Sequence, residues 1–494
     1  MEDTTQKQED FVDDIPEDLS LPHKHWIERH THQKVRLLTY NIFMRPVIGF
    51  FADQKDERMK EIKQAITKYD IACFQEIFPH MNGRREELMK FANRAKFKYA
   101  AVPPSPGFTG IFKGTLLNSG LLTLSKYPIK ATKFFPFKAG SGVDALAEKG
   151  VLYCKIELSD MQAMHLFNTH TQATYNNEYQ PDNKSDHNNY VARLKQLMEL
   201  RTAIDLALRE FSTYSPVNPD KFHDLVIVAG DFNVNSRGKP LPKKQFTKLP
   251  WVSRLQKDYF MEYEFLVGVL SRDGADKIID LACEGLGEHP ITFGDVTICP
   301  KEKIPLPRET CITSKSEWMS CQSLDYIFQL VPGAVNVHTP DYNYHIDPKD
   351  CKQEEFFFAN SKKFTQLSDH YGIECSLTVR HSKDEETHPH PRLTRGLSDL
   401  ILGEPTMSQM ERTGGARIVR IKTELSQSVE DFVDTAEMVS TDIKVNTVTS
   451  EEVVGKVEGG ERQKEEKEGE GVGKNEGKLE EKDGTGAGQL GEGN

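Results

Sequence analysis

Short apolar runs alternate with amphipathic segments between about residues 35 and 380. Apolar runs bounded by turn residues, such as DIACFQE, predict buried strands, whereas apolar residues spaced three and four apart predict helices. Strands are predicted at 35–41, 70–76, 98–103, 118–128, 149–158, 163–170, 224–233, 323–330 and 370–379, and helices at 53–69, 83–95 and 186–211. Many strands with few helices predict an α+β fold, a four-layer α/β/β/α sandwich of two packed mixed sheets flanked by helices.

The two ends of the chain differ from this middle in composition and charge. Of the net charge of −12, residues 1–34 carry −5 and residues 381–494 carry −10, which leaves about +3 for residues 35–380. The last 114 residues are polar and rich in Gly, Glu and Lys, so they cannot bury enough apolar area to offset the entropy of ordering. We therefore expect a polar acidic segment at 1–34, one folded domain at 35–380 and a disordered acidic tail at 381–494.

Several classes of protein are disfavoured by the same composition. No run approaches the roughly 20 apolar residues of a membrane-spanning helix. The first residues lack the apolar core of a signal peptide, so we expect a cytoplasmic location and no secretion. The eight cysteines form no CxxC or Cys/His pattern typical of zinc sites. Cys73, Cys154 and Cys375 are expected to be small buried apolar residues.

Polar residues recur at the ends of the apolar strands, where a rigid core could hold them at the surface. One such residue is usually a turn former. A set of acidic, amide and imidazole side chains at these positions is harder to explain as turns and indicates a catalytic site. The set comprises Asn41, Glu76, His170, Asp231, Asn233, Asp325, Asp369 and His370.

This set suits hydrolysis of a phosphodiester. Glu76 with Asn41 offers the sparse oxygen ligands that Mg²⁺ prefers, with Mn²⁺ as an alternative. His370 could take a proton from water if Asp325 held its tautomer. His170 and Asn233 could then donate hydrogen bonds to the phosphoryl oxygens, and Asp231 could orient the water.

The ordered motifs LLTYNIF, FQE, NTH, GDFN, LDYIF and SDH resemble the endonuclease/exonuclease/phosphatase superfamily over residues 35–380. Three further stretches resemble its magnesium-dependent neutral sphingomyelinases: YNIFMRP followed by KDER, NSGLLTLSKYPI, and GSGVDALAEKGVLYCKI. The resemblance implies a phospholipase C-type phosphodiesterase that cleaves sphingomyelin at a membrane surface to ceramide and phosphocholine. It also implies that Asp369 completes the site and that Asp144 and Lys149 pair in a loop that shapes access to it.

Departures from the family patterns limit the assignment to a branch. No segment resembles the WCDRIL motif of the inositol phosphatases, which disfavours that branch. Where nucleases place an acid before the strand GLLTLS, this chain has Asn118 and Ser119. The hydrophobic membrane segments of some animal neutral sphingomyelinases are also missing. A DNase-like nuclease and an inactive binding module with a partner-recruiting tail remain as alternatives.

Membrane contact is predicted from residues 88–143, which hold nine basic and no acidic residues with phenylalanines between them. Such a stretch could contact anionic lipid as a peripheral protein does. Nine charges over 56 residues are sparse for a nucleic-acid groove, so nucleic acid is not favoured. A second aromatic stretch, at 249–270, is expected to pack in the core rather than lie at a bilayer surface.

Overall fold

A computed structural model of the chain describes residues 31–45, 53–79, 83–105, 117–160, 162–176, 178–212, 224–333, 344–358, 363–381 and 417–420. Nearly all of the predicted acidic segment at 1–34 and of the tail at 381–494 therefore lies outside the described residues, and the domain boundaries stay predictions. Phe108, Phe112 and Lys113 of the basic stretch also lie outside them.

One sheet has eight strands and contains the first strand of the described chain. Its path runs through β15 (Tyr344–His345), β17 (Gly372–His381), β1 (Thr31–Met44), β2 (Ile71–Ile77), β4 (Leu122–Ser125), β3 (Tyr99–Val102) and β18 (Arg417–Arg420), and β16 (Lys352–Glu354) also pairs with β17. β1 and β2 are parallel, and the other neighbours are antiparallel. The sheet is therefore mixed, as predicted.

The second sheet has six strands and is also mixed. Its order is β11 (Lys277–Asp280), β14 (Asp325–Val331), β8 (Leu225–Asp231), β7 (Ala163–His170), β6 (Gly150–Glu157) and β5 (Ile129–Pro136). β7 and β8 are parallel because the long helix α5 (Lys184–Phe211) connects them, and the other pairs are antiparallel.

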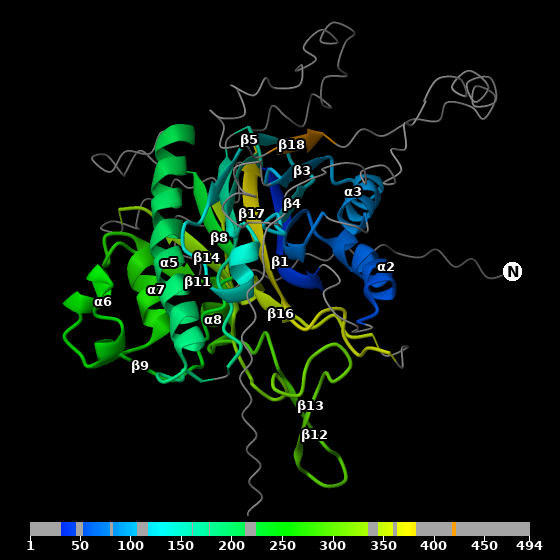
Figure 1. The fold of residues 1–494 in the computed structure, drawn as a ribbon. Helices are drawn as coiled ribbons and strands as arrows, with labels where there is room; N and C mark the ends of the chain where they lie inside the picture. The colour runs from blue at the N-terminus through cyan, green and yellow to red at the C-terminus, as the bar shows by residue number, and fades with distance from the viewer. Residues whose placement is uncertain are drawn as a thin grey trace, which may run out of the picture. The chain divides into compact units, whose positions relative to one another are not determined.

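Three apolar clusters correspond to the contacts between four layers. One cluster lies between the sheets and contains Ile71, Leu152 and Ile227. A second joins α5 and α7 (Glu262–Leu270) to the six-stranded sheet, and a third joins α2 (Lys55–Ala65) and α3 (Arg84–Arg94) to the eight-stranded sheet. Figure 1 shows the green helices α5 and α7 on one side of the strands and the blue helices α2 and α3 on the other. The predicted α/β/β/α sandwich is confirmed.

A buried amide pair links the two sheets beneath the end where the site residues lie. Gln75 on β2 donates from Nε2 to Oδ1 of Asn168 on β7 at 2.9 Å. Asn168 in turn donates from Nδ2 to the Phe74 carbonyl oxygen at 3.3 Å and to the Leu122 carbonyl oxygen at 3.2 Å. Both amide side chains are fully buried. Because unpaired amides are costly in such a place, these bonds define how the sheets are positioned against each other.

The remaining elements are short. They are α6 (Pro250–Arg254), α8 (Leu281–Leu286), the two-residue strands β9 (Leu241–Pro242) and β10 (Tyr259–Phe260), and the hairpin of β12 (Val296–Ile298) and β13 (Pro305–Pro307). The aromatic stretch at 249–270 packs mainly in the core, as expected, and only Tyr259 among its aromatic residues is largely exposed.

Two local findings differ from the sequence expectation. Cys375 on β17 is not a lone buried apolar residue, because it forms a disulfide with Cys351, the residue directly before β16. Within the predicted disordered tail, Arg417–Arg420 forms β18 and pairs with the edge strand β3. An edge strand has unpaired backbone groups, and the backbone of this four-residue segment satisfies those of β3.

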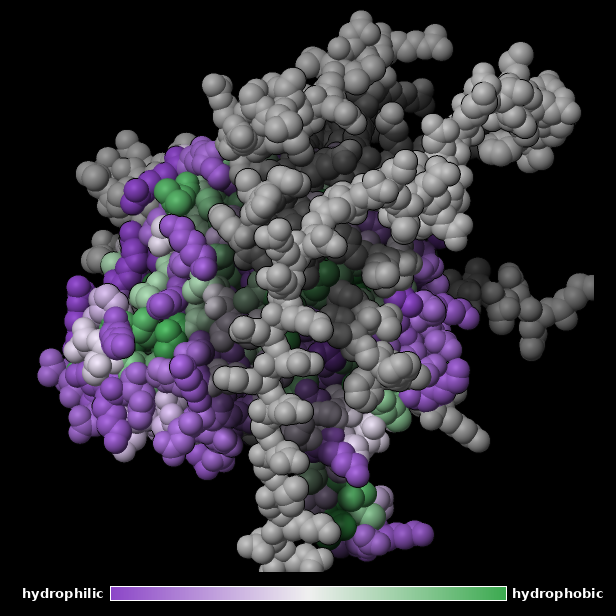
Figure 2. Space-filling model, in the orientation of Figure 1, coloured by the Kyte–Doolittle hydropathy of each residue, from purple (hydrophilic) through white to green (hydrophobic). Residues whose placement is uncertain are grey.

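Apolar side chains are exposed on the β12–β13 hairpin, among them Ile298, Ile304 and Leu306. Figure 2 shows apolar surface there next to charged surface. None of the helices in the described ranges is both long and apolar enough to cross a bilayer.

Candidate functional site

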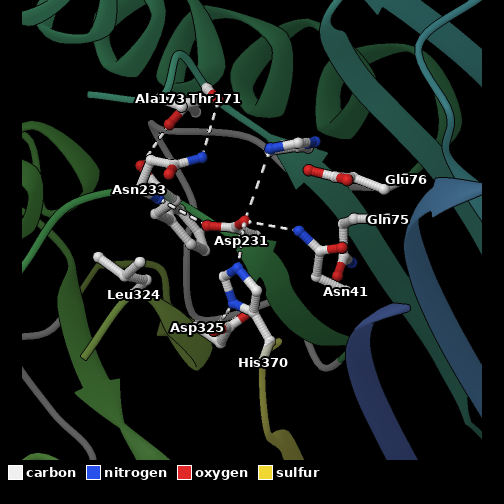
Figure 3. A network of polar contacts seen from close by, with 12 residues as sticks. Asn41, Gln75, Glu76, Thr171, Ala173, Asp231, Asn233, Leu324, Asp325 and His370 are labelled. Atoms are coloured by element: carbon white, nitrogen blue, oxygen red, sulfur yellow. Dashed lines mark hydrogen bonds and ion pairs between the residues drawn. The ribbon is translucent and has the colours of Figure 1, made fainter. Parts of the chain in front are cut away.

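Strand register brings the predicted site residues to one end of both sheets. In the six-stranded sheet, Asp231 at the end of β8 is opposite His170 of β7 on one side and Asp325 of β14 on the other. In the eight-stranded sheet, Asn41 and Glu76 lie near the ends of the parallel strands β1 and β2. Figure 3 shows Asn41 and Glu76 from one sheet pointing toward Asp231 from the other.

Asp231 is the centre of the polar contacts between the sheets. Asn41 donates from Nδ2 to Asp231 Oδ2 at 3.0 Å, and the backbone N–H of Asn233 donates to Asp231 Oδ1 at 2.9 Å. Asn41 Oδ1 accepts the N–H of Phe43 at 3.1 Å. Although burial opposes it, the histidines His370 and His170 hold the pKa of Asp231 below its usual range. Asp231 is therefore an anionic hydrogen-bond acceptor at neutral pH.

Unusual backbone conformations surround these groups. Glu76 has φ 58° and Asn233 has φ 51°, both in the left-handed region that non-glycine residues rarely adopt. Gly230 has φ 147°, and a Cβ there would lie 2.0 Å from the carbonyl oxygen of Thr169. The glycine of GDFN is thus required by the close approach of β7. Strained residues cluster at functional sites because the surrounding structure must hold them in place.

His370 and Asp325 form a buried pair. Nδ1 of His370 lies 2.8 Å from Asp325 Oδ2, and both side chains are nearly inaccessible to solvent. Nε2 of the same ring lies 3.8 Å from Asp231 Oδ2, a spacing that one water molecule could bridge. Although burial lowers it, the carboxylates of Asp325 and Asp231 raise the pKa of His370 well above its usual value. Because a carboxylate can only accept, the imidazole donates from Nδ1 and directs Nε2 toward Asp231.

Glu76 and Asp369 place two carboxyl groups on the other side of the site. Burial raises the pKa of Asp369 to about 7, the charge of Glu76 adds to the increase, and His370 opposes it. Glu76 Oε2 is buried without a hydrogen-bond partner and lies 3.7 Å from Nε of Arg45. A bound cation would offset the repulsion between the Glu76 and Asp369 carboxylates. It would also give the unsatisfied Glu76 oxygen a partner. Together with Asn41, these oxygens fit the hard-ligand preference of Mg²⁺.

Lys149 is the nearest cation to His170. Its ammonium group lies 3.0 Å from Nε2 of His170 and 3.0 Å from a carboxylate oxygen of Asp144, and it donates to the Thr171 carbonyl oxygen at 2.6 Å. An ammonium group can only donate, so Nε2 of His170 accepts and the proton lies on Nδ1, which has no partner. Burial, together with Lys149, lowers the pKa of His170, so its ring is neutral at pH 7.

Asp144 holds the loop that carries Lys149 onto this end of the sheets. Besides Lys149, it accepts the backbone N–H of Ala173 at 2.8 Å and the hydroxyl of Tyr175 at 3.2 Å. Although burial opposes it, the ammonium of Lys149 holds the pKa of Asp144 below its usual range. The predicted pair of Asp144 and Lys149 is present, and its effect on substrate access stays a prediction.

All ten predicted site residues lie within this connected region, and the catalytic role of each stays a prediction. Sequence reasoning missed three supporting residues. Arg45 lies against Glu76, Thr292 accepts the backbone N–H groups of Leu324 and Asp325, and the ring of Phe293 lies 5.0 Å from that of His370. Arg45 could have been predicted from the sequence, because it belongs to the YNIFMRP stretch. Nothing in the sequence around residues 292 and 293 distinguishes them from an ordinary loop.

An open cleft adjoins the site beside Asn233. It has a volume of about 210 Å³, and Thr174, Tyr190, Arg193 and Gln322 also line it. Arg193 is buried and donates to Glu262 at 2.7 and 2.8 Å, so its charge is compensated. The cleft is therefore polar with little net charge, and it is large enough to admit part of a substrate.

Comparison with known proteins gives a family match, two related sequences and a related solved structure. Residues 38–328 match the model of the Endonuclease/Exonuclease/phosphatase family. The chain is 30% identical over 358 residues to a sphingomyelinase of Dictyostelium discoideum, which covers 64% of this chain and 73% of that protein. It is 27% identical over 168 residues to sphingomyelin phosphodiesterase 3 of Homo sapiens, over 34% of this chain and 24% of that one. The solved structure of sphingomyelinase C from Streptomyces griseocarneus aligns with a TM-score of 0.42 at 17% identity, over 70% of this chain and 99% of that chain.

Proposed function

Because the chain belongs to the endonuclease/exonuclease/phosphatase family, we propose that it is a Mg²⁺-dependent phosphodiesterase that hydrolyses sphingomyelin to ceramide and phosphocholine. The fold and the relatives support phosphodiester hydrolysis. The choice of sphingomyelin is supported by the 30% identity to a sphingomyelinase over most of this chain. The observation that carries the hydrolytic role is the His370–Asp325 pair, whose second ring nitrogen, Nε2, lies 3.8 Å from Asp231 Oδ2.

Water activation follows from the geometry of this pair. With Nδ1 donating to Asp325, Nε2 of a neutral His370 can accept a proton from a water held between it and Asp231. Asp231 accepts a hydrogen bond from the other O–H of that water. This turns a lone pair of the water oxygen away from Asp231. The water then attacks phosphorus opposite the ceramide oxygen, and the bond between phosphorus and that oxygen breaks. The leaving oxygen takes up the proton that His370 received, either directly or through solvent.

Glu76, Asp369 and Asn41 would hold Mg²⁺, whose charge stabilises the phosphoryl and leaving oxygens when it is bound. On the opposite side of Asp231, Lys149 provides a fixed positive charge, and Asn233 retains one amide hydrogen besides the bond that it donates to the Thr171 carbonyl oxygen at 3.1 Å. These donors are placed to stabilise charge that grows on the phosphoryl oxygens.

The substrate is proposed to be reached from the aqueous side of a membrane, with the chain as a peripheral protein. A cytoplasmic location and contact with anionic lipid stay predictions.

A substrate panel tests the proposal. The full chain would be assayed on vesicles of sphingomyelin, phosphatidylcholine or lyso-phosphatidylcholine and on plasmid DNA, each with Mg²⁺ and with chelator. We expect phosphocholine release from sphingomyelin that requires the metal, and no nicking of DNA. Plasmid cleavage with intact sphingomyelin would instead establish the nuclease alternative.

Glu76→Ala is the matching variant, because it removes the proposed metal carboxylate. Turnover is expected to fall by about three orders of magnitude or more without loss of the folded state, as judged by thermal unfolding. Glu57→Ala is the control, since Glu57 is an exposed acid on α2 that pairs with Lys363. Undiminished Mg²⁺-dependent turnover in Glu76→Ala would exclude this metal site.

A further inference from the structure

A second group of metal-competent side chains lies outside the catalytic site. It consists of Asp280, at the end of β11, Cys283 in α8, and His289 in the loop that follows α8. One ligand atom from each residue lies within 4.8 Å of the other two. α8 packs against β11, β14 and β16. The hydrolysis proposed above uses none of these three residues.

We propose that Asp280, Cys283 and His289 bind a transition-metal ion of the Zn²⁺ class. The donor set is one carboxylate oxygen, one thiolate sulfur and one imidazole nitrogen, which are the ligand types of protein zinc sites. A tetrahedral zinc site holds ligand atoms roughly 3.3–3.8 Å apart. His289 Nδ1 already lies 3.5 Å from Asp280 Oδ2, and the Cys283 sulfur lies within 4.8 Å of a ligand atom of each of these residues. With water as the fourth ligand, the three residues would make a tetrahedral site.

The unsatisfied state of His289 supports a ligand at this place. Its Nδ1 is buried from solvent and has no hydrogen-bond partner, although it faces the group. The ring is held edge-on against Tyr263 with 4.5 Å between centroids, and its backbone carbonyl oxygen accepts from Arg237 at 2.8 Å. Asp280 is held by the Tyr263 hydroxyl at 2.9 Å. Two of the three ligands are therefore positioned before any metal arrives.

Local charge also favours a cation. The carboxylates of Asp280, Glu284 and Glu288 all lie near enough to the Cys283 thiol to act on it electrostatically. The same negative surroundings attract a divalent ion, whose binding displaces the thiol proton to solvent. The sequence alone does not indicate this group, because the spacing D-x₂-C-x₅-H contains no cysteine pair and only one histidine.

Metal at this place would join α8 to the segment that orients the catalytic pair. Three residues after His289, Thr292 accepts the N–H groups of Leu324 and Asp325 at 2.9 and 3.3 Å. The next residue, Phe293, packs its ring on His370. A bound ion would therefore fix the His289 end of the short segment 289–293, which contacts Asp325 and His370.

Cobalt binding tests the site without an activity assay. Co²⁺ would be titrated into the metal-free full chain carrying Glu76→Gln, which removes the proposed catalytic metal carboxylate. We expect one bound ion with the near-ultraviolet charge-transfer absorption of a cobalt–thiolate bond. Cys283→Ser should lose this absorption, whereas the control Cys311→Ser, which changes an exposed thiol elsewhere, should keep it.

A second variant distinguishes the loss of a metal ligand from misfolding. His289→Asn retains the thiol, so the absorption should persist while cobalt affinity falls by about tenfold or more. Zn²⁺ should raise the Tm of the Glu76→Gln protein and leave that of the Cys283→Ser double variant unchanged. Cobalt binding without charge-transfer absorption, or absorption that survives Cys283→Ser at full strength, would overturn the proposal. Neither outcome bears on the catalytic role of His370, so the two proposals fail separately.

Discussion

His370 lies between two buried carboxylates, and its ionisation sets the pH range in which it can act as a base. Asp325 and Asp231 raise the pKa of His370, while a base must be neutral to accept a proton. Activity should therefore rise with pH through an elevated His370 pKa. The charge of Mg²⁺ at Glu76 and Asp369 would shift this range downward.

Asp325→Asn tests the ionisation argument at this residue. Loss of the negative charge lowers the pKa of His370, so the acidic limb of the kcat/KM profile should move to lower pH. The maximal rate should fall by about 10³-fold or more, because Nδ1 loses the acceptor that sets its tautomer. The measurement is a pH profile at saturating Mg²⁺. An acidic limb that stays in place would show that His370 is not the titrating base.

Asp369 is a buried acid whose folded pKa of about 7 exceeds the ordinary value of 3.8. The folded state therefore binds more protons than the unfolded state between these values, and stability falls as pH rises through this window. Asp369→Asn should raise Tm in metal-free buffer at about pH 8, with a gain on the order of 1 kcal/mol. It should raise Tm less at about pH 5, where the native carboxyl is already protonated.

Magnesium provides the control for Asp369→Asn. The native chain should gain Tm on addition of Mg²⁺, and the variant should gain less because it lacks one proposed ligand. Destabilisation of the variant at about pH 8 would contradict the pKa argument.

Residue types at the site could be predicted from the sequence because strand ends carry a recognisable pattern. Asn41, Glu76 and Asp231 each follow an apolar run. The contact of Lys149 with His170 could not be predicted, because it depends on how a loop folds over the end of β7. The disulfide partner of Cys375 was equally hidden, since Cys351 lies before a three-residue strand that gives no apolar signal.

At the scale of elements, one buried guanidinium organises the segments that carry the site. Arg58 on α2 donates to the carbonyl oxygens of Ile42 at 3.1 Å, Phe43 at 2.8 Å and Leu367 at 2.9 Å. It thereby joins the end of β1 to the segment before Asp369. Because its side chain is fully buried, water cannot easily replace the hydrogen bonds that it donates to these carbonyl groups.

Arg58→Lys should destabilise the chain by about 2–4 kcal/mol, because an ammonium group cannot reach three carbonyl oxygens in a planar fork. Turnover should fall as well, since Asn41 and Asp369 lie on the segments that Arg58 joins. Thermal unfolding and kcat are the measurements. Arg94→Lys is the matched control, because Arg94 is an exposed residue of α3. Equal Tm values for the two variants would contradict the proposal that Arg58 holds these segments together.

Element prediction from the sequence succeeded where burial was complete. The residues of β2, β7 and β8 are buried almost without interruption, and each strand was predicted within a residue or two. β5 was missed because its residues alternate irregularly between buried and exposed positions. The two- and three-residue strands and α8 were missed because such short pieces are stabilised by tertiary contacts rather than by local periodicity.

At the scale of the whole molecule, the basic stretch at 88–143 divides between the two ends of the sheets. Lys98 precedes β3, whose first residue is opposite the last residue of β4, at the end remote from Glu76. Lys138 follows β5, whose last residue is opposite Gly150, beside the site end of β7. Lys126, Lys130 and Lys133 pair with Asp70, Glu157 and Glu210, so their charge is compensated.

Lipid contact that serves catalysis should therefore depend on Lys138 and not on Lys98. Lys138→Glu should weaken binding to anionic vesicles containing sphingomyelin by about tenfold at low salt. Lys98→Glu is the control with the same change of charge at the remote end. Vesicle sedimentation at two salt concentrations is the measurement. A larger effect of Lys98→Glu would place the lipid surface at the other end of the molecule.

The buried amides of Gln75 and Asn168 have a consequence for how the molecule can adapt. The catalytic groups are shared between two sheets, and sliding of one sheet over the other would separate Glu76 from His370. Such sliding would break the bond between Gln75 and Asn168 in a region that water cannot enter. Accommodation of differently shaped lipids must therefore come from the connecting loops, and laboratory evolution of substrate range should accumulate changes there while leaving this amide pair untouched.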